Sequence, residues 1–366
     1  MGYRVLLTLF VLLAAGCGSR EESGAMDLRD ILGAGGSAGY ARAVAVREFQ
    51  FPRDHGGHPD FRNEWWYLTG HLRDERGRLF GYQATFFRFA LAPKPPRRPS
   101  AWATNQVWMA HVALTDVAGA AHLADQRFAR GALGLAGASG EHLRVWLGDW
   151  YLREEDGVWR LRVDAGAFAL NLTLAPAKPV VLQGDRGLSR KGPEPGNASY
   201  YYSFTRVQTE GTLRRRGETH AVTGLSWLDR EWGTGSLAAG QVGWDWFSLQ
   251  LDSGADLMYY RLRDEEGTSH PASRGTWVTR DGRSRDIGPG KIGLEPLDWW
   301  RSADGRRYPV RWRLDYPEAG LDLIVRAVLP DQHMDLAVAY WEGLVEVVDT
   351  RSGRILGHGY LEMTGY

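Results

Sequence analysis

Two carboxylic acids lie close together in the segment GLSWLDREWG (224–233), where Asp229 and Glu231 follow Trp227. Side chains alternate between the faces of a strand, so these three would share one face while Trp232 takes the other. Like charges held in an apolar environment raise the pKa of one of them. A neutral acid beside a carboxylate is the pairing that general acid–base catalysis requires. The alternative is a strand end whose charged side chains are solvated.

A third candidate acid, Glu64, lies near the start of the aromatic segment NEWWYLTGHL (63–72). On a strand, Glu64 and Trp66 would point to the same side. An acid on the same face as a tryptophan could be a catalytic carboxyl group that is partly buried in a cavity. It could equally pair with an arginine at the rim, for which Arg62 and Arg88 are available.

Aromatic residues are frequent, with 16 tryptophans, and such clusters mark either cores or apolar ligand sites. In GWDWFSL (243–249), Asp245 would lie on one strand face, opposite Trp244 and Trp246. His111 lies within the apolar run WMAHVALTD, where it could be a ligand contact or a hydrogen-bonded core residue. The side chains predicted to contact an apolar ligand are Trp65, Trp66, Tyr67, His111, Trp227, Trp232, Trp244, Asp245 and Trp246.

Motifs for metals and organic cofactors are weak. His55 and His58 are flanked by acids in PRDHGGHPD (52–60), but metal ligation needs three or four converging groups and no second histidine pair follows. Residues 224–228 lack the second glycine of a G-x-S-x-G elbow. The glycines of 233–235 lack the βαβ unit of a dinucleotide site. We therefore expect no metal and no cofactor.

Short apolar runs rich in Val, Thr, Tyr, Trp and Phe follow one another without amphipathic helices, which predicts antiparallel sandwiches or barrels. A hairpin pattern also recurs: 63–72 with 79–87 resembles 243–251 with 257–262. A second pattern, of a strand, a charged turn that contains glycine and another strand, occurs at 207–229 and again at the end of the chain. Such repetition predicts two similar units. We place them at residues 46–236 and 237–366.

The beginning of the chain predicts export. A short basic start and an apolar run lead to Gly16 and Cys17, the only cysteine of the chain. Residues 1–17 resemble a bacterial lipoprotein signal in which Cys17 is lipidated; an ordinary signal peptide is the alternative. The apolar run is shorter than a membrane span needs. Residues 18–45 are predicted to be a flexible tether. We expect a lipoprotein on the periplasmic face of the outer membrane.

Three segments together resemble a known family: FPRDHGGHPDFRNEWWYLTGHL (51–72), SYYYSFTRV (199–207) and GLSWLDREWG (224–233). They are similar to the AttH-like family, whose members are often labelled predicted secreted hydrolases and are related to the carotenoid 1,2-hydratases (hydroxyneurosporene synthases). The resemblance implies two consecutive lipocalin-like antiparallel β-barrels. For the hydratase branch it implies addition of water across a terminal C=C bond without metal or organic cofactor. Trp227 and Asp229 match a Trp-Asp pair of that branch. A later Tyr and Asp of the hydratases would fall near residues 259–261, but here no Asp closely follows Tyr259.

The function expected is therefore that of an exported, membrane-anchored lipoprotein that binds a long apolar molecule, isoprenoid or lipid-like, and hydrates or hydrolyses it. In this mechanism Asp229 or Glu231 protonates an alkene, and tryptophan faces stabilise the cation before water attacks. The alternatives are a non-catalytic carrier or envelope assembly factor, and aromatics that only join two domains. The net charge is zero, so the composition does not indicate the excess of basic residues typical of nucleic-acid binding. Whether Asp229 and Glu231 face an enclosed apolar cavity distinguishes these possibilities.

Overall fold

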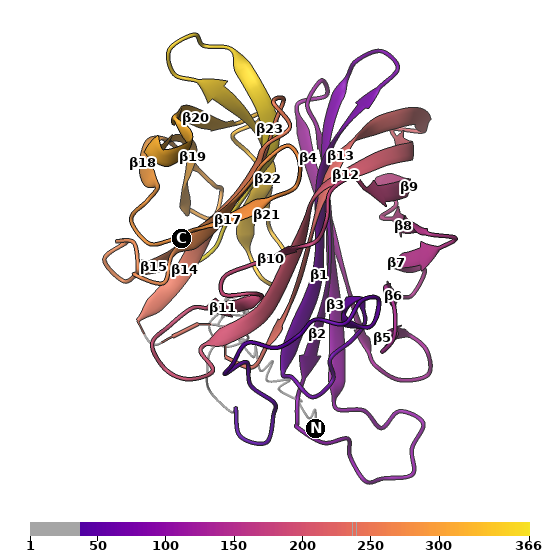
Figure 1. Ribbon diagram of the computed structural model, residues 1–366. Helices are drawn as coiled ribbons and strands as arrows, with labels where there is room; N and C mark the ends of the chain where they lie inside the picture. The colour runs from indigo at the N-terminus through magenta and orange to yellow at the C-terminus, as the bar shows by residue number, and fades with distance from the viewer. Residues whose placement is uncertain (1–36, 236, 239) are drawn as a thin grey trace, which may run out of the picture.

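The protein is a pair of antiparallel β-barrels (Figure 1). The computed structural model describes residues 37–366 except 236 and 239. Within these residues the regular structure is all strand apart from two short 3₁₀ turns, Arg53–His55 and Pro317–Ala319. The all-β prediction, with two barrel domains, is confirmed.

The first barrel is a 13-stranded sheet in the order β4-β3-β2-β1-β13-β12-β9-β8-β7-β6-β5, with β10 and β11 paired to β12. The sheet curls until β6 contacts β2, β3 and β4. Its strands are β1 (Asn63–Asp74), β2 (Leu79–Ala90), β3 (Gln106–Asp116), β4 (Ala121–Arg130), β5 (Ala136–Ala138), β6 (Arg144–Leu147), β7 (Trp150–Glu155), β8 (Val158–Asp164), β9 (Phe168–Pro176), β10 (Val181–Leu182), β11 (Leu188–Arg190), β12 (Ala198–Arg215) and β13 (Glu218–Gly233).

The second barrel is a 10-stranded, more open sheet in the order β17-β16-β15-β14-β23-β22-β20-β19-β18, with β21 paired to β22. Its strands are β14 (Gln241–Leu251), β15 (Asp256–Asp264), β16 (Arg274–Val278), β17 (Ser284–Ile287), β18 (Gly293–Arg301), β19 (Arg307–Tyr316), β20 (Leu321–Ala327), β21 (His333–Met334), β22 (Tyr340–Asp349) and β23 (Ile355–Met363). The change of sheet thus falls between Gly233 and Gln241.

The repeated hairpins occupy the same place in both barrels. Each barrel opens with a hairpin, β1–β2 or β14–β15, and closes with another, β12–β13 or β22–β23. The last strand then pairs with the first, as β13 with β1 and β23 with β14. The repeated sequence patterns therefore correspond to the first and last hairpins of each barrel, which pair with each other.

Side chains fill the interior of both barrels. Trp66, Trp150 and Trp232 lie fully buried in the first core, and Phe247 and Trp312 lie in the second. An eight- to ten-stranded barrel can either be filled in this way or hold one ligand. Here the interiors are packed, so a ligand site must be sought elsewhere.

The two barrels meet along the outer faces of their opening and closing strands. β1 contacts β23, β2 contacts β22 and β12 contacts β14 (Figure 1). A third apolar cluster with members from both barrels, among them Tyr67, Trp227 and Trp246, lies in this interface. Both faces of these strands are therefore buried, which explains their unusually aromatic sequences.

Residues 37–45 do not behave as part of a tether. Ala43 is 1% exposed within the first core, the hydroxyl of Tyr40 donates to the Ala90 carbonyl, and the Ala41 amide donates to Asp60. The predicted boundary at residue 45 is corrected on this point, because the segment has polar and apolar partners on the barrel. The predicted signal sequence, Cys17 and residues 18–36 lie outside the described residues. In the described part, no helix has the length and apolarity to cross a membrane.

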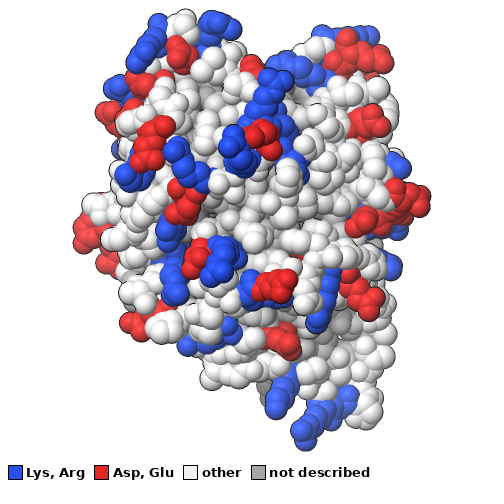
Figure 2. All heavy atoms as spheres, in the orientation of Figure 1, with Lys and Arg blue, Asp and Glu red and all other residues white. Residues whose placement is uncertain are grey.

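The outer surface mixes both signs of charge. On the face in Figure 2, lysine and arginine side chains are interspersed with aspartate and glutamate. Ion pairs of the described part of the chain include Arg313 with Asp322 and Arg326 with Glu346. This distribution agrees with the net charge of zero.

Candidate functional site

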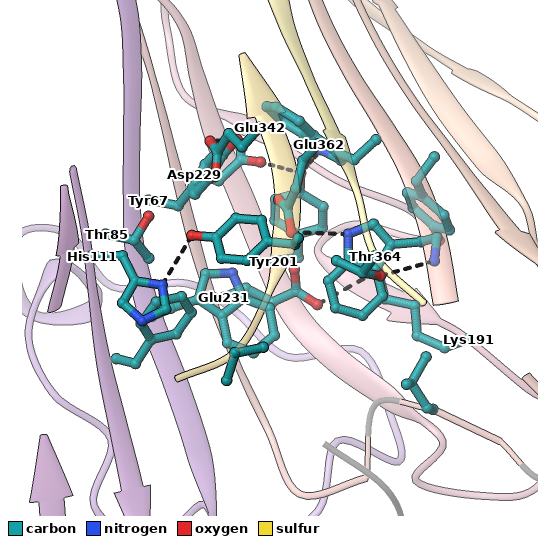
Figure 3. A pocket seen from close by; sticks show the side chains of 18 of the residues that line it. Tyr67, Thr85, His111, Lys191, Tyr201, Asp229, Glu231, Glu342, Glu362 and Thr364 are labelled. Atoms are coloured by element: carbon teal, nitrogen blue, oxygen red, sulfur yellow. Dashed lines mark hydrogen bonds and ion pairs between the residues drawn. The ribbon is translucent and has the colours of Figure 1, made fainter. Parts of the chain in front are cut away.

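A cavity of about 110 Å³ lies between the two barrels and is lined by both of them (Figure 3). This is room for several water molecules. The apolar lining consists of Trp65, Phe87, Phe89, Met109, Leu237, Trp244, Trp246, Leu262 and Val338. The polar lining consists of Tyr67, Thr85, His111, Lys191, Tyr201, Asp229, Glu231, Tyr260, Tyr340, Glu342, Glu362 and Thr364.

Strand alternation decides which residues reach the cavity. In β1, Trp65 and Tyr67 point away from the first core and toward the second barrel. Asp229 and Glu231 do the same in β13, where they lie opposite Tyr67 and Trp65 in the strand register. The predicted common face of Asp229 and Glu231 is thus the face that lines the cavity.

Asp229 is a buried acid with three hydrogen-bond donors. The indole N–H of Trp227 donates to Oδ1 at 2.6 Å, the Ser203 hydroxyl donates to Oδ1 at 2.5 Å, and the Tyr201 hydroxyl donates to Oδ2 at 2.5 Å. Burial raises the pKa of Asp229 to about 7 even though these donors favour the carboxylate. The group therefore exists in both protonation states near neutral pH.

Glu231 has a cation beside it. The Ser199 hydroxyl donates to its Oε1, and the Lys191 ammonium lies 3.5 Å from the same oxygen. The ammonium also lies 4.0 Å from the ring centroid of Tyr260. Burial opposes the charge of Lys191, but the Glu231 carboxylate more than offsets this and raises the lysine pKa. Lys191 thus remains an ammonium group that pairs with Glu231.

Two further acids, Glu342 and Glu362, enter the cavity from the second barrel. The Tyr67 hydroxyl donates to Glu342 Oε1 at 2.5 Å, and the Trp244 indole donates to Glu362 Oε1 at 3.2 Å. Burial and the neighbouring Glu362 raise the pKa of Glu342 well above its ordinary value. Burial raises the pKa of Glu362 to about 8. Uncharged carboxylic acids thus face an aromatic cavity near pH 7.

His111 lines the cavity as a neutral imidazole. Its Nδ1 lies 3.0 Å from the Tyr340 hydroxyl, and burial lowers its pKa to about 3. Its Nε2 has no hydrogen-bond partner within the described part of the chain. The residue can therefore donate or accept one hydrogen bond to a ligand but carries no charge.

Glu64, predicted as a catalytic acid, is corrected. It lies on the core side of β1, where the guanidinium groups of Arg88 and Arg230 pair with its two oxygens. Although burial opposes ionisation, these arginines hold the pKa of Glu64 well below its usual range. Glu64 is a buried anion outside the cavity, and the alternative pairing with Arg88 is the one observed.

Four predicted ligand contacts also lie away from the cavity lining. Trp66 packs in the first core with the Arg230 guanidinium 3.7 Å from its ring centroid. Trp232 stacks on His58 at 3.7 Å between ring centroids. Trp227 lies behind Asp229, to which it donates. Trp66 and Trp232 thus belong to the first core, and Trp227 belongs to the apolar cluster of the interface without lining the cavity.

Asp245 is the fourth of these and pairs with arginines in its barrel as Glu64 does in the first. Arg261 and Arg263 pair with its Oδ2 at 2.6 and 3.3 Å, and the Tyr366 hydroxyl donates to Oδ1 at 2.7 Å. Asp245 faces Arg261 across β14–β15 as Glu64 faces Arg88 across β1–β2. Each acid therefore links the first two strands of its barrel through an ion pair with arginine.

The histidines of the 52–60 loop have protein partners. His55 Nδ1 lies 2.6 Å from the Tyr202 hydroxyl, and His58 Nε2 lies 3.1 Å from Asp54 Oδ1. Over the described ranges there is no group of three or more His, Cys, Asp or Glu side chains that could hold a metal ion.

Glu342 and Glu362 were missed although the repeat contained a signal for Glu362. Asp229 of β13 lies opposite Tyr67 of β1 in the strand register, and Glu362 of β23 lies opposite Trp246 of β14. Tyr67 and Trp246 are the corresponding cavity-facing residues of the two opening strands. Aligning the closing strands by this register places Glu362 at the position of Asp229, so the two barrels contribute acids symmetrically.

Taken together, fold and site define a double-barrel protein with an acid-rich aromatic cavity at the junction of its domains. The chain belongs to the AttH-like family, whose model matches residues 42–366. The suspected family resemblance is thereby confirmed.

Two solved structures share the fold. That of an AttH protein from Nitrosomonas europaea has a TM-score of 0.80 and 38% identity, with 89% of this chain and 99% of that chain covered. Kievitone hydratase from Nectria haematococca has a TM-score of 0.66 and 15% identity, with 89% and 95% covered. At this identity the second likeness shows the fold alone.

A curated relative, kievitone hydratase of Fusarium solani subsp. phaseoli, is 22% identical over 204 residues. The match covers 53% of this chain and 56% of the relative. The chain thus spans about half of the length of the curated relative that it matches.

Proposed function

We propose that this chain is an enzyme that adds water across a C=C bond of an uncharged, largely apolar molecule bound between the two barrels. The observation that carries this proposal is the set of buried acids that face an aromatic cavity. Burial raises the pKa of Asp229 to about 7 and that of Glu362 to about 8. The fold shared with a kievitone hydratase supports the reaction type.

The chemistry needs only groups that line the cavity. A neutral carboxylic acid gives its proton to one alkene carbon, so that a C–H bond forms and the π bond breaks. The cation that results can lie against aromatic faces such as those of Trp246 and Tyr67. A water molecule then forms the C–O bond and loses a proton to the carboxylate. Alkene and water give an alcohol, and the acid is regenerated.

The charges around the cavity favour an uncharged ligand. Asp229, Glu231, Glu342 and Glu362 are all acids, and the lysine of the lining, Lys191, is already paired with Glu231. A carboxylate or phosphate ligand would meet negative or acidic groups in a poorly solvated space. We therefore expect the wild-type protein to bind a short-chain alkenol more tightly than the alkenoate of the same length, measured by tryptophan fluorescence.

The reaction is tested by incubating the protein with a panel of uncharged alkenes in D₂O. In D₂O a hydratase incorporates deuterium at carbon. In water that carries a heavy oxygen isotope it incorporates that oxygen into the alcohol, and mass spectrometry detects both labels. Asp229→Asn tests whether that acid takes part, because Asn keeps the shape and cannot transfer the proton. Tight binding of alkenes without any labelled product would instead favour the carrier function, which the apolar lining also suits.

We further propose that the protein is exported and anchored in the outer membrane through a lipid on Cys17. The support is the signal-like pattern of residues 1–17. Replacing Cys17 by Ser should move the protein from the membrane fraction to the soluble periplasm. Cys17→Ser protein that still sediments with membranes in the absence of the lipid would contradict the anchor.

A further inference from the structure

One carboxyl group of the cavity differs from the others in its hydrogen bonds. Glu342 is fully buried and its Oε1 accepts the Tyr67 hydroxyl at 2.5 Å. Its Oε2 has no hydrogen-bond partner among the residues that the structure describes, although it lies in the cavity wall. Tyr340, the polar neighbour on the same strand, has its hydroxyl 3.0 Å from His111 Nδ1 and also interacts with the Glu342 carboxyl group, where it favours the ionised form. A buried carboxyl oxygen without a partner is costly unless a proton or a ligand completes it.

Asp229 and Glu231 have more polar partners than Glu342, whereas Glu362 accepts one bond, from the Trp244 indole at 3.2 Å. Both oxygens of Asp229 accept hydrogen bonds, from Trp227, Ser203 and Tyr201. The indole N–H of Trp227 can only donate, so it favours the carboxylate at Oδ1. Glu231 is paired with Lys191. Of these four acids, Glu342 is the one with a buried carboxyl oxygen that has no hydrogen-bond partner in the described part of the chain.

Resting on the proposed function, we propose that Glu342 is the proton donor of the hydration reaction and that Tyr67 of the opposite barrel is its positioning residue. Glu342 comes from β22 and Tyr67 from β1, so the catalytic unit forms only where the barrels meet (Figure 3). This assigns the acid step to a residue of the second barrel rather than to Asp229 or Glu231.

The hydrogen-bond pattern fits a neutral acid before transfer and a carboxylate after it. In the neutral acid, Oε1 is the carbonyl oxygen that accepts from Tyr67, and Oε2 carries the proton. Transfer of that proton to an alkene carbon leaves the negative charge on Glu342, where the Tyr67 O–H becomes a charge-assisted donor. Burial raises the pKa of Tyr67 well above its ordinary value, so the phenol keeps its proton throughout. The attacking water returns a proton to Oε2 and restores the acid.

Aromatic side chains around Glu342 suit the cation that would form. Tyr67 and Trp246 lie edge to face with ring centroids 5.0 Å apart, and Trp227 lies beyond Trp246 at 6.2 Å. The Trp246 indole donates to the Tyr201 hydroxyl at 3.2 Å, which fixes its ring. A fixed ring face beside the donor can stabilise positive charge without reorganising.

The experiment compares Glu342→Gln, Tyr67→Phe and a matched control, Glu346→Gln. Glu346 lies on the same strand but pairs with Arg326 at the surface. Infrared spectra of the ligand-free proteins report the carbonyl stretch of a protonated carboxyl group. Deuterium incorporation into an alkene that the wild type converts reports turnover, and tryptophan fluorescence reports affinity for that alkene.

Glu342→Gln should remove one protonated-carboxyl band and lower turnover by about 100- to 10,000-fold, the usual contribution of a general acid, with affinity changed only a few-fold. Tyr67→Phe should keep that band but move it to higher frequency, because the carbonyl loses its donor. Its turnover should fall by about 10- to 100-fold, as for loss of a hydrogen bond to a charged group. Glu346→Gln should match the wild type in all three measurements.

The two proposals fail in different ways. Wild-type turnover in Glu342→Gln, or an unmoved carboxyl band in Tyr67→Phe, overturns the donor assignment and leaves the hydratase proposal standing. Loss of turnover in Asp229→Asn alone would transfer the role to Asp229. A wild-type protein that binds alkenes, shows the Glu342 band and labels no product overturns the hydratase proposal, and with it the donor role.

Discussion

Glu64 and Asp229 are both acids on aromatic strands, yet their neighbours drive them to opposite protonation states. Two guanidinium groups meet Glu64, so its pKa falls well below the usual range. Asp229 meets only uncharged donors, and burial raises its pKa to about 7. Direct contact with a cation is therefore what separates a structural anion from a candidate acid in this protein.

Replacing Glu64 by Gln should lower the free energy of unfolding by about 3–5 kcal/mol, because two buried arginines lose their counter-charge. Urea denaturation followed by tryptophan fluorescence measures this. Asp149→Asn removes an exposed partner of Arg127 and should cost no more than about 1 kcal/mol. Equal effects of the two substitutions would show that Glu64 does not hold the barrel.

The acids of the cavity predict a stability that falls as the solution becomes alkaline. The pKa of Glu362 is about 8 in the folded protein against an ordinary 4.5, so the folded state holds the proton more tightly. The stabilisation is complete below about pH 4.5 and is lost as the pH rises through about 8. Glu362→Gln should therefore show a shallower decline of unfolding free energy between these values than the wild type, in denaturant titrations at several pH values. Glu346→Gln, with its acid at the surface, should keep the wild-type slope.

At the scale of strands, register decides whether a tryptophan supports the fold or meets a ligand. Trp66 of β1 points into the first core, whereas Trp246 of β14 points into the cavity. Trp246 takes the cavity-facing side of β14 as Tyr67 does in β1, and Asp245 takes the core side as Glu64 does. An offset of one residue changes the face, so sequence similarity alone pairs the wrong tryptophans.

Truncation separates these two roles. Trp66→Ala should lower the unfolding free energy by about 3–5 kcal/mol, as expected for a large side chain lost from a packed core. Trp246→Ala should cost less stability and should weaken binding of an uncharged alkene or alcohol at least about tenfold. Thermal or urea unfolding and ligand titration, applied to both variants, measure the difference. The same loss of binding in a fully folded Trp66→Ala protein would contradict this division.

At the scale of the whole molecule, the candidate active site depends on how the barrels are held together. Asp256 of the second barrel accepts from Lys178 at 2.7 Å, Arg206 at 2.6 Å and Thr205 at 2.8 Å, all from the first barrel. Asp256 is fully buried. This cluster fixes the interface that also forms the cavity.

Asp256→Asn should therefore cost about 3–5 kcal/mol of stability, since it leaves Lys178 and Arg206 without their buried partner. Because the cavity is made by both barrels, affinity for an uncharged alkene should fall as well. Asp298→Asn, which breaks an exposed pair with Arg311 inside one barrel, is the control and should leave binding unchanged. Full affinity in Asp256→Asn would show that the cluster does not set the cavity.

The sequence by itself determined the β class, the two units and the faces of the key strands. Period-two alternation is local, so Asp229 and Glu231 could be placed on one face of their strand, and Glu64 and Trp66 on one face of theirs. Alternation could not tell which face meets the second barrel, and so Glu64 was predicted as a catalytic acid and Trp66 and Asp245 as ligand contacts. Only the tertiary structure brought Glu342 from β22 to Tyr67 of β1, 275 residues apart in the chain. Their contact, and the pKa shifts that follow from shared burial, depend on how two barrels pack, which no local pattern encodes.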